Sequence, residues 1–232
     1  MIVLHTLGRR WFVVAFLVGY FAASVPERGW KASIRFAVIA YGVALAAELS
    51  STRNGFPFSH YTYAGETRGD ELYVSNIPAF VPAGYAVMIY AGRSIATFVT
   101  RSRAALVAIG AVATMAIDLV VDPVSVRGSQ WFLGHLFDYA TPKPWFGVPL
   151  ADFGGWTLVA AAVIGLDLLF GHREPIRPAP RGLALAAAVV AFDVVLAFAI
   201  GAVGFAFAAL AVAGIMALTV WLSRRRTPET AT

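Results

Sequence analysis

The sequence predicts an all-α integral membrane protein, a polytopic bundle of about seven transmembrane helices. Of its 232 residues, 59% are hydrophobic and only 13% are charged, and the mean hydropathy is +0.72. The apolar residues also gather in runs of about twenty, the length that crosses a bilayer. Because no polar linker interrupts the chain, residues 1–232 are expected to form a single transmembrane domain.

The apolar runs place the expected spans in chain order. Five helices are expected over 11–25, 34–49, 77–99, 104–121 and 154–170. The stretch 182–222 contains one charge, Asp193, and exceeds one crossing of about 30 Å of hydrocarbon. We therefore divide it near Gly201 to Gly204 into a sixth and a seventh helix. The first run also fits a signal peptide cleaved after Ala22-Ala23-Ser24, which would remove one span.

The charges of the loops predict the orientation of the bundle, because Lys and Arg concentrate on the cytoplasmic side. One side carries Arg28, Lys31, Arg35, Arg101, Arg103, Arg173, Arg177, Arg181, Arg224, Arg225 and Arg226, and the other Arg9, Arg10, Arg53, Arg68, Arg127 and Lys143. The N-terminus is therefore expected outside a cell membrane and the C-terminus in the cytoplasm. The basic loops that give the net charge of +5 are expected to bind the anionic headgroups of the lipid bilayer. No basic run interleaved with aromatics predicts a nucleic-acid partner.

Two long loops, 50–76 and 122–153, fall on the same predicted face. They are rich in aromatic residues, namely Phe56, Phe58, Tyr61, Tyr63, Trp131, Trp145, Phe146 and Phe153. Long loops on a rigid scaffold often carry function, which favours a functional mouth on this face. An interfacial belt of aromatic side chains would give the same pattern, and both interpretations stay open.

Asp118 and Asp122 form the most informative pair of acids. Four residues apart, they share one helix face at about 5–6 Å, and Pro123 is expected to end that helix. Two carboxyls this close in a low dielectric cannot both ionise easily, so one is expected to keep its proton and serve as an acid. The alternatives are a structural pair bridged to Arg53 or Arg127, and a magnesium site with oxygen ligands.

Three further acids lie in or at the ends of spans. Glu48 closes the second span and is either a second functional acid or a helix-end residue at the headgroups. Asp167 and Asp193 are expected to satisfy neighbouring helices. The chain has no cysteine, and its four histidines lack metal-ligand spacing. We therefore expect neither a histidine-bound metal nor any cofactor.

Three segments carry a family resemblance: Glu48 to Tyr63 (ELSSTRNGFPFSHYTY), Asp118 to Pro123 (DLVVDP) and Trp145 to Trp156 (WFGVPLADFGGW). In this order and between these spans they resemble the carotenoid biosynthesis family of membrane hydratases. That family includes the carotenoid 1,2-hydratases of bacteria and the bisanhydrobacterioruberin hydratase of haloarchaea. The resemblance covers roughly 34–160. It departs at Ser59, where the family favours Gly, and at Asp152, where it favours Asn.

The resemblance implies a hydro-lyase that adds water across the terminal C1=C2 bond of an acyclic carotenoid, without a cofactor. Its catalytic acids and bases would be Asp118, Asp122, Glu48 and Asp152. Aromatic rings would face the tertiary cation formed at C1. The candidates for this substrate contact are Phe56, Phe58, Tyr61, Tyr63, Trp145, Phe153 and Trp156. Other enzymes of carotenoid biosynthesis are candidate partners.

Two rival functions remain at the level of sequence. A carotenoid end-group cyclase would use the same protonation and omit the water. A small proton-coupled transporter would use Asp118, Asp167 and Asp193, since intramembrane acids mark proton pathways. The chain shows no internal repeat, so an inverted-repeat transporter gains no support.

Overall fold

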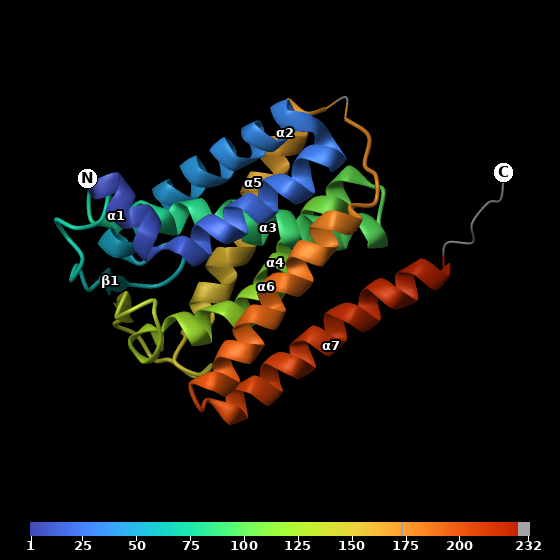
Figure 1. Cartoon of the computed structure of the whole chain (residues 1–232). Helices are drawn as coiled ribbons and strands as arrows, with labels where there is room; N and C mark the ends of the chain where they lie inside the picture. Colours follow the sequence, from blue (N-terminus) through green and yellow to red (C-terminus); the bar gives the residue numbers. More distant parts are fainter. Residues whose placement is uncertain (173, 227–232) are drawn as a thin grey trace.

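The computed structural model describes residues 1–172 and 174–226, and it is a helical bundle (Figure 1). Its helices are α1 (Ile2–Arg9), α2 (Trp11–Asn54), α3 (Phe80–Val99), α4 (Arg103–Ser125), α5 (Leu150–Phe170), α6 (Pro180–Ala199) and α7 (Val203–Arg226). Five of these, α2 and α4 to α7, are long and apolar enough to cross a membrane. The predicted all-α membrane bundle is confirmed. Arg173, counted above for the orientation, lies outside the described residues.

Helix α2 consists of two helices that fold back on each other at Gly29. That residue adopts φ 80° and ψ 164°, a conformation open to glycine, and Pro26 lies just before it. The Tyr20 hydroxyl donates to the Ser33 carbonyl oxygen at 2.7 Å, which ties the two halves together. The chain around Tyr20 lies in the core. With this fold-back, the described residues form seven long helical segments, as predicted.

Helix α3 is the central helix of the bundle. Residues 85–97 are all buried, and α3 packs against α2, α4, α6 and α7. Several of its polar side chains bind other groups inside the protein, as where the Tyr90 hydroxyl donates to Glu27 at 2.6 Å. The prediction that this span begins at Ile77 was wrong. Ile77–Pro78 is the short strand β3, and the helix begins at Phe80.

The two long loops lie on the same side of the bundle, as predicted. Strand β1 (Tyr61–Tyr63) of the first loop pairs antiparallel with β4 (Phe137–Tyr139) of the second, with Tyr61 opposite Tyr139. Within the first loop, β2 (Tyr73–Val74) pairs with β3, and the second loop also holds a short 3₁₀ helix, Gly128–Gln130. The β1–β4 pair brings aromatic residues from both loops over one end of the helices.

The opposite end is held by ion pairs around Asp167. This buried carboxylate accepts hydrogen bonds from Arg28 Nη2 at 2.6 Å and Arg35 Nη2 at 3.0 Å. Both arginines also pair with Glu174. Asp167 therefore links α5 to both halves of α2, which agrees with the expectation that it satisfies neighbouring helices.

The last two helices separate where predicted. Helix α6 ends at Ala199, Gly201 turns the chain with φ 74°, and α7 begins at Val203. In Figure 1, α7 starts beside the end of α6 and diverges from the rest of the bundle toward its C-terminal end. The two long loops and helices α2 to α6 therefore form the main body of the bundle, and α7 lies at its edge.

Arg10, just before α2, locks this helix to both long loops. Its guanidinium binds Glu71 of the first loop in a bidentate pair, Nε–Oε1 at 2.6 Å and Nη2–Oε2 at 2.8 Å. Its Nη1 donates to the Leu133 carbonyl oxygen of the second loop at 2.5 Å. The same guanidinium lies 4.3 Å from the centroid of the Phe80 ring. Arg10 and Glu71 are both buried.

Gly155 on α5 allows this helix to contact the first loop closely. A Cβ at this position would lie 2.5 Å from Phe58 Cδ1 and 2.8 Å from the Pro57 carbonyl oxygen, whereas a Cβ at Gly154 meets nothing within 4 Å. We expect Gly155→Ala to lower the free energy of unfolding by about 1–3 kcal/mol through overpacking. The adjacent Gly154→Ala should be neutral or slightly stabilising. Thermal denaturation of both variants in detergent would measure the difference, and equal melting temperatures would contradict the close contact.

Candidate active site

Three buried carboxyls meet at the end of the bundle beneath the long loops. Asp118 and Asp122 lie one turn apart on α4, as their spacing predicts, and Asp152 joins them from the first turn of α5. Each offers an oxygen within 4.8 Å of the others. The expectation that Pro123 ends the helix was wrong. Helix α4 continues to Ser125 with Pro123 inside it, and Asp122 is thereby held on the helix.

The Tyr139 hydroxyl lies between two carboxyls of this cluster, Asp122 and Asp152. The Tyr139 oxygen lies 3.0 Å from Asp122 Oδ2 and 2.9 Å from Asp152 Oδ1. Burial first, and the charge of Asp122 second, raise the pKa of Tyr139 well above its ordinary value, so the phenol keeps its hydrogen. One phenol has one hydrogen to donate. A proton on one of the two carboxyls, donated to the phenol oxygen, would give each of the two contacts its own hydrogen.

No basic side chain neutralises the three carboxyls among the described residues. Arg127, one of the two predicted partners, donates instead to the carbonyl oxygens of Pro123 and Phe146, both at 2.6 Å. Both oxygens of Asp118 and Oδ2 of Asp152 are buried without a hydrogen-bond partner. The predicted salt bridge to Arg127 is therefore wrong. Three carboxyls in this setting hold protons or a cation, and their oxygen donors suit Mg²⁺ chemically.

Glu48, at the end of α2, is held by a second polar cluster. Its carboxylate accepts hydrogen bonds from the hydroxyls of Tyr63 and Tyr85, both at 2.6 Å, and from the Tyr61 hydroxyl. Burial, followed by the charge of Glu48, raises the pKa of Tyr61 and Tyr63 well above the ordinary value, so both stay protonated donors. Glu48 is therefore a buried, oriented carboxylate and not an exposed helix-end residue.

The β1–β4 pair joins the two clusters. Because Tyr61 lies opposite Tyr139 in this pair, the ring that binds Glu48 packs against the ring that binds Asp122 and Asp152. The two ring centroids are 5.6 Å apart. The long loops thus place two tyrosines, one for each acidic cluster, side by side.

A cavity of about 200 Å³ lies between the two clusters. Glu48, Asp122, Asp152 and Asp193 reach its wall, whereas Asp118 lies behind Asp122 and does not line it. The rest of the wall is mainly apolar and aromatic, including Phe12, Phe16, Phe58, Tyr61, Tyr63, Tyr85, Met88, Trp131, Phe137, Tyr139, Trp156 and Phe192. This volume is well above the roughly 10–15 Å³ that a single buried water needs. It can therefore accommodate a short hydrocarbon end and a little water.

Four of the seven predicted substrate contacts line this cavity, namely Phe58, Tyr61, Tyr63 and Trp156. The other three do not. Phe56 is 64% exposed, and Phe153 is buried in the core. The Trp145 indole donates to the Leu119 carbonyl oxygen at 3.0 Å, which anchors the second loop to α4.

Sequence reasoning missed Tyr85 and Tyr139, which complete the two clusters. The Tyr85 ring stacks on Trp156 with centroids 4.3 Å apart and an interplanar angle of 11°, and Phe58 lies 5.9 Å from Trp156. These rings form an aromatic wall beside Glu48. A tyrosine inside an apolar run was the only signal for Tyr85, and nothing local distinguished Tyr139 from other loop tyrosines.

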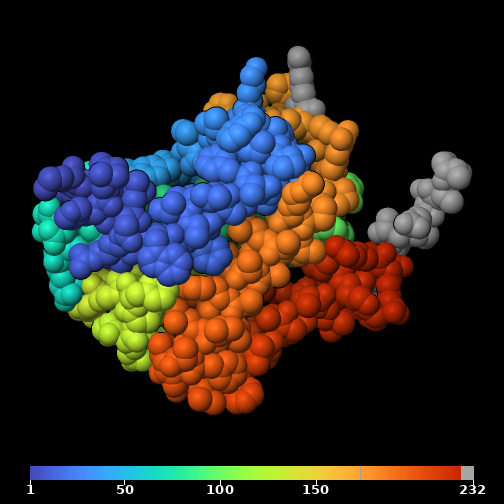
Figure 2. Space-filling model, in the orientation of Figure 1, coloured from blue at the N-terminus to red at the C-terminus, as the bar shows by residue number. Residues whose placement is uncertain are grey.

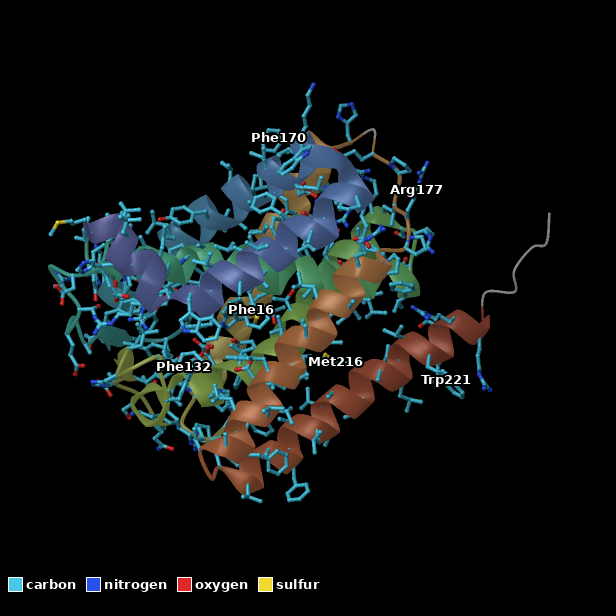
Figure 3. The ribbon with its side chains drawn as sticks, in the orientation of Figure 1. Phe16, Phe132, Phe170, Arg177, Met216 and Trp221 are labelled. Carbon is cyan, nitrogen blue, oxygen red and sulfur yellow. The ribbon has the colours of Figure 1, made fainter. Side chains whose placement is uncertain are left out.

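The expectation that Asp193 satisfies a neighbouring helix was wrong. Asp193 is buried on α6, yet among the described residues its carboxyl has no hydrogen bond or ion pair to the protein, and it lines the cavity. Its neighbour Phe192 contacts Phe16 of α2, with ring centroids 5.4 Å apart. Figure 3 shows Phe16 and Phe132 on the side of the site where α2, α6 and the second loop meet.

Comparison with known proteins identifies a family for the chain. No curated protein and no solved structure matches the chain. A family model described as "Carotenoid biosynthesis protein" matches residues 8–220, which is nearly the whole chain and extends beyond the segment 34–160 of the sequence resemblance. The chain belongs to the carotenoid biosynthesis protein family.

Proposed function

We propose that this protein is a carotenoid hydratase that adds water across the terminal C1=C2 bond of an acyclic carotenoid. Membership of the family implies a carotenoid as substrate. The observation that carries the hydratase proposal is the buried cluster of Asp118, Asp122 and Asp152 beside an apolar cavity with aromatic walls, a setting that favours a retained proton. Alkene hydration begins with a strong acid in such a place.

Asp122 and Asp152 are the acids that face the cavity, and in this mechanism one of them protonates C2. The π electrons form the new C–H bond, and a tertiary cation remains at C1. Asp118 does not line the cavity. Its carboxyl adds a third acidic group to the cluster, which disfavours ionisation of all three and keeps a proton available. Tyr139 holds the two cavity-facing carboxyls in place through its single hydroxyl.

The cation would form beside groups that stabilise positive charge. Tyr85 and Trp156 present aromatic rings to the cavity, which attract a cation electrostatically. The Glu48 carboxylate contributes negative charge whose position is set by three tyrosine hydroxyls. Water then adds to C1 and loses a proton to a carboxylate on the wall, for which Glu48, Asp152 and Asp193 are available. No redox cofactor is required by this reaction.

The size of the cavity also supports an end-group reaction. About 200 Å³ accommodates the last carbons of a polyene together with a water molecule. The rest of the molecule would lie among the helices or in the lipid, in a multi-pass protein of the cell membrane with its N-terminus outside. The site therefore suits an enzyme that acts on the terminal double bond.

The proposal is tested by expressing the chain in a bacterium that accumulates lycopene and analysing the extracted pigment by mass spectrometry. We expect a new pigment heavier by one or two waters, absent with the vector alone. A new pigment of unchanged mass would contradict hydration and identify an end-group cyclase. Unchanged lycopene, with the protein correctly inserted, would point to another acyclic carotenoid or to the proton-coupled transporter.

A further inference from the structure

Asp193 is a buried carboxyl to which the mechanism above assigns no definite role. It lies in the middle of α6, is 5% exposed and faces the cavity. Three other buried acids have protein partners: Glu71 binds Arg10, Asp167 binds two arginines, and Glu48 binds three tyrosines, whereas Asp118, away from the cavity wall, has none in the described part of the chain. Asp193 has no such partner among the described residues. A carboxyl at this depth is costly unless something in the cavity binds it.

The surroundings of Asp193 indicate what binds it. Val189 and Phe192 flank it on the same helix and offer no hydrogen bond, whereas Asp122 of α4 lies on the wall of the same cavity. A buried water needs about two to four polar partners and a polar space large enough to hold it. Asp193 of α6 and Asp122 of α4 provide carboxyl oxygens to the cavity from two helices.

We propose that Asp193 is the catalytic base that holds the attacking water and takes its proton. This inference rests on the hydratase function proposed above. As the water oxygen forms its bond to C1, one of its O–H bonds breaks and the proton passes to the Asp193 carboxylate. Asp122 or Asp152 has meanwhile given a proton to C2. Transfer of the proton from Asp193 back to that carboxylate restores the site, and the net change is one water added.

The other two wall carboxylates are less suited to this step. Glu48 already accepts three hydrogen bonds, which occupy most of its four or so acceptor positions. Asp152 shares Tyr139 with Asp122 and belongs to the cluster that supplies the acid. A separate base on α6 lets acid and base act on neighbouring carbons from different walls. Asp193 is the wall carboxyl that protein hydrogen bonds leave free.

Turnover in D₂O separates protonation from water capture. Membranes containing the protein would be supplied with lycopene in deuterated buffer, and each pigment would be analysed for mass. A cation that is not captured returns a proton and leaves deuterium in the unhydrated carotenoid. We expect Asp193→Asn to lower the hydrated product about 100-fold, while deuterium still enters lycopene. Asp193→Glu, which keeps a carboxylate, should recover part of the hydration.

Each other outcome has a distinct meaning. Hydration by Asp193→Asn at the wild-type rate would overturn the assignment. Loss of both hydration and deuterium entry in a stably folded variant would also overturn it, because Asp193 would then act on protonation. If the wild-type protein introduces deuterium but never adds water, the hydratase function itself fails, and the role of Asp193 fails with it.

Discussion

Asp122→Asn is expected to reduce carotenoid hydration by about 10²–10⁴-fold, the contribution of a positioned general acid. Asp122 is the member of the Asp118/Asp122 pair that reaches the cavity, and an amide there cannot donate a proton of sufficient acidity. The protein should remain folded because Asn keeps the shape of the side chain. Product formation from lycopene, normalised to the amount of protein in the membrane, measures the loss.

Asp118→Asn is the matched control for this prediction. It makes the same chemical change one turn away on the same helix, at a carboxyl that does not line the cavity. Its effect should be smaller, since it alters the charge of the cluster without removing the group that meets the substrate. Equal activity of Asp122→Asn and wild type would exclude Asp122 as the acid and leave Asp152 as the cavity-facing acid of the cluster. A greater loss at Asp118 would assign proton transfer to the buried member.

Arg10→Met should be the most destabilising exchange at the loop face, lowering the free energy of unfolding by about 3–5 kcal/mol. The change leaves the Glu71 carboxylate buried without its partner and also removes the donor to the Leu133 carbonyl oxygen. Because Arg10 connects both loops to α2, the loops should also become mobile. Leu133 and Phe80, which Arg10 contacts, line the cavity. Thermal denaturation in detergent and proteolysis of the two loops would measure both effects.

Arg9→Met is the control, because Arg9 is the adjacent residue with the same charge and its side chain is exposed. It should change stability by less than about 0.5 kcal/mol, as surface substitutions usually do. If both variants melted at the same temperature, the bidentate Arg10–Glu71 pair would not hold the loops in place.

The helices were predictable because the property that defines them is local. Runs of about twenty apolar residues mark membrane spans whatever their neighbours are, so most boundaries lay within a few residues of the prediction. Pro123 misled the prediction because proline only weakens a helix that tertiary packing can sustain. Helix α3 shows another limit. It is surrounded by other helices, so Tyr85 and Tyr90 donate to acids of α2, and hydropathy does not reveal such contacts.

The candidate site was predictable only in part. The spacing of Asp118 and Asp122 placed them on one face, and the family resemblance indicated Glu48 and Asp152. Which carboxyls share a proton depends on Tyr139, whose position follows from strand pairing between two distant loops. Asp193 was misjudged because a single acid in an apolar run does not reveal whether it faces a neighbouring helix or a cavity.

The packing of one face of the molecule limits how substrate can reach the cavity from the lipid. In Figure 2 the first half of α2, the second loop and α6 meet on one face over the region of the cavity. Their contact includes Phe12 and Trp131, with ring centroids 5.6 Å apart, and Phe132 and Phe192, at 6.4 Å. A hydrocarbon approaching from the lipid on this face would meet these aromatic rings before it reached the cavity.

The small volume of the cavity determines how much of its substrate the protein can recognise. A cavity of about 200 Å³ holds one terminus of a polyene, and the rest of the polyene would lie outside it. An enzyme that binds only the terminus would not select substrates by chain length, so it would act on different pigments that share the same terminus. A symmetrical pigment would also have to leave and return in the opposite direction for its second addition. The half-modified pigment would then be a freely diffusing product, open to capture by any other enzyme in the same bilayer.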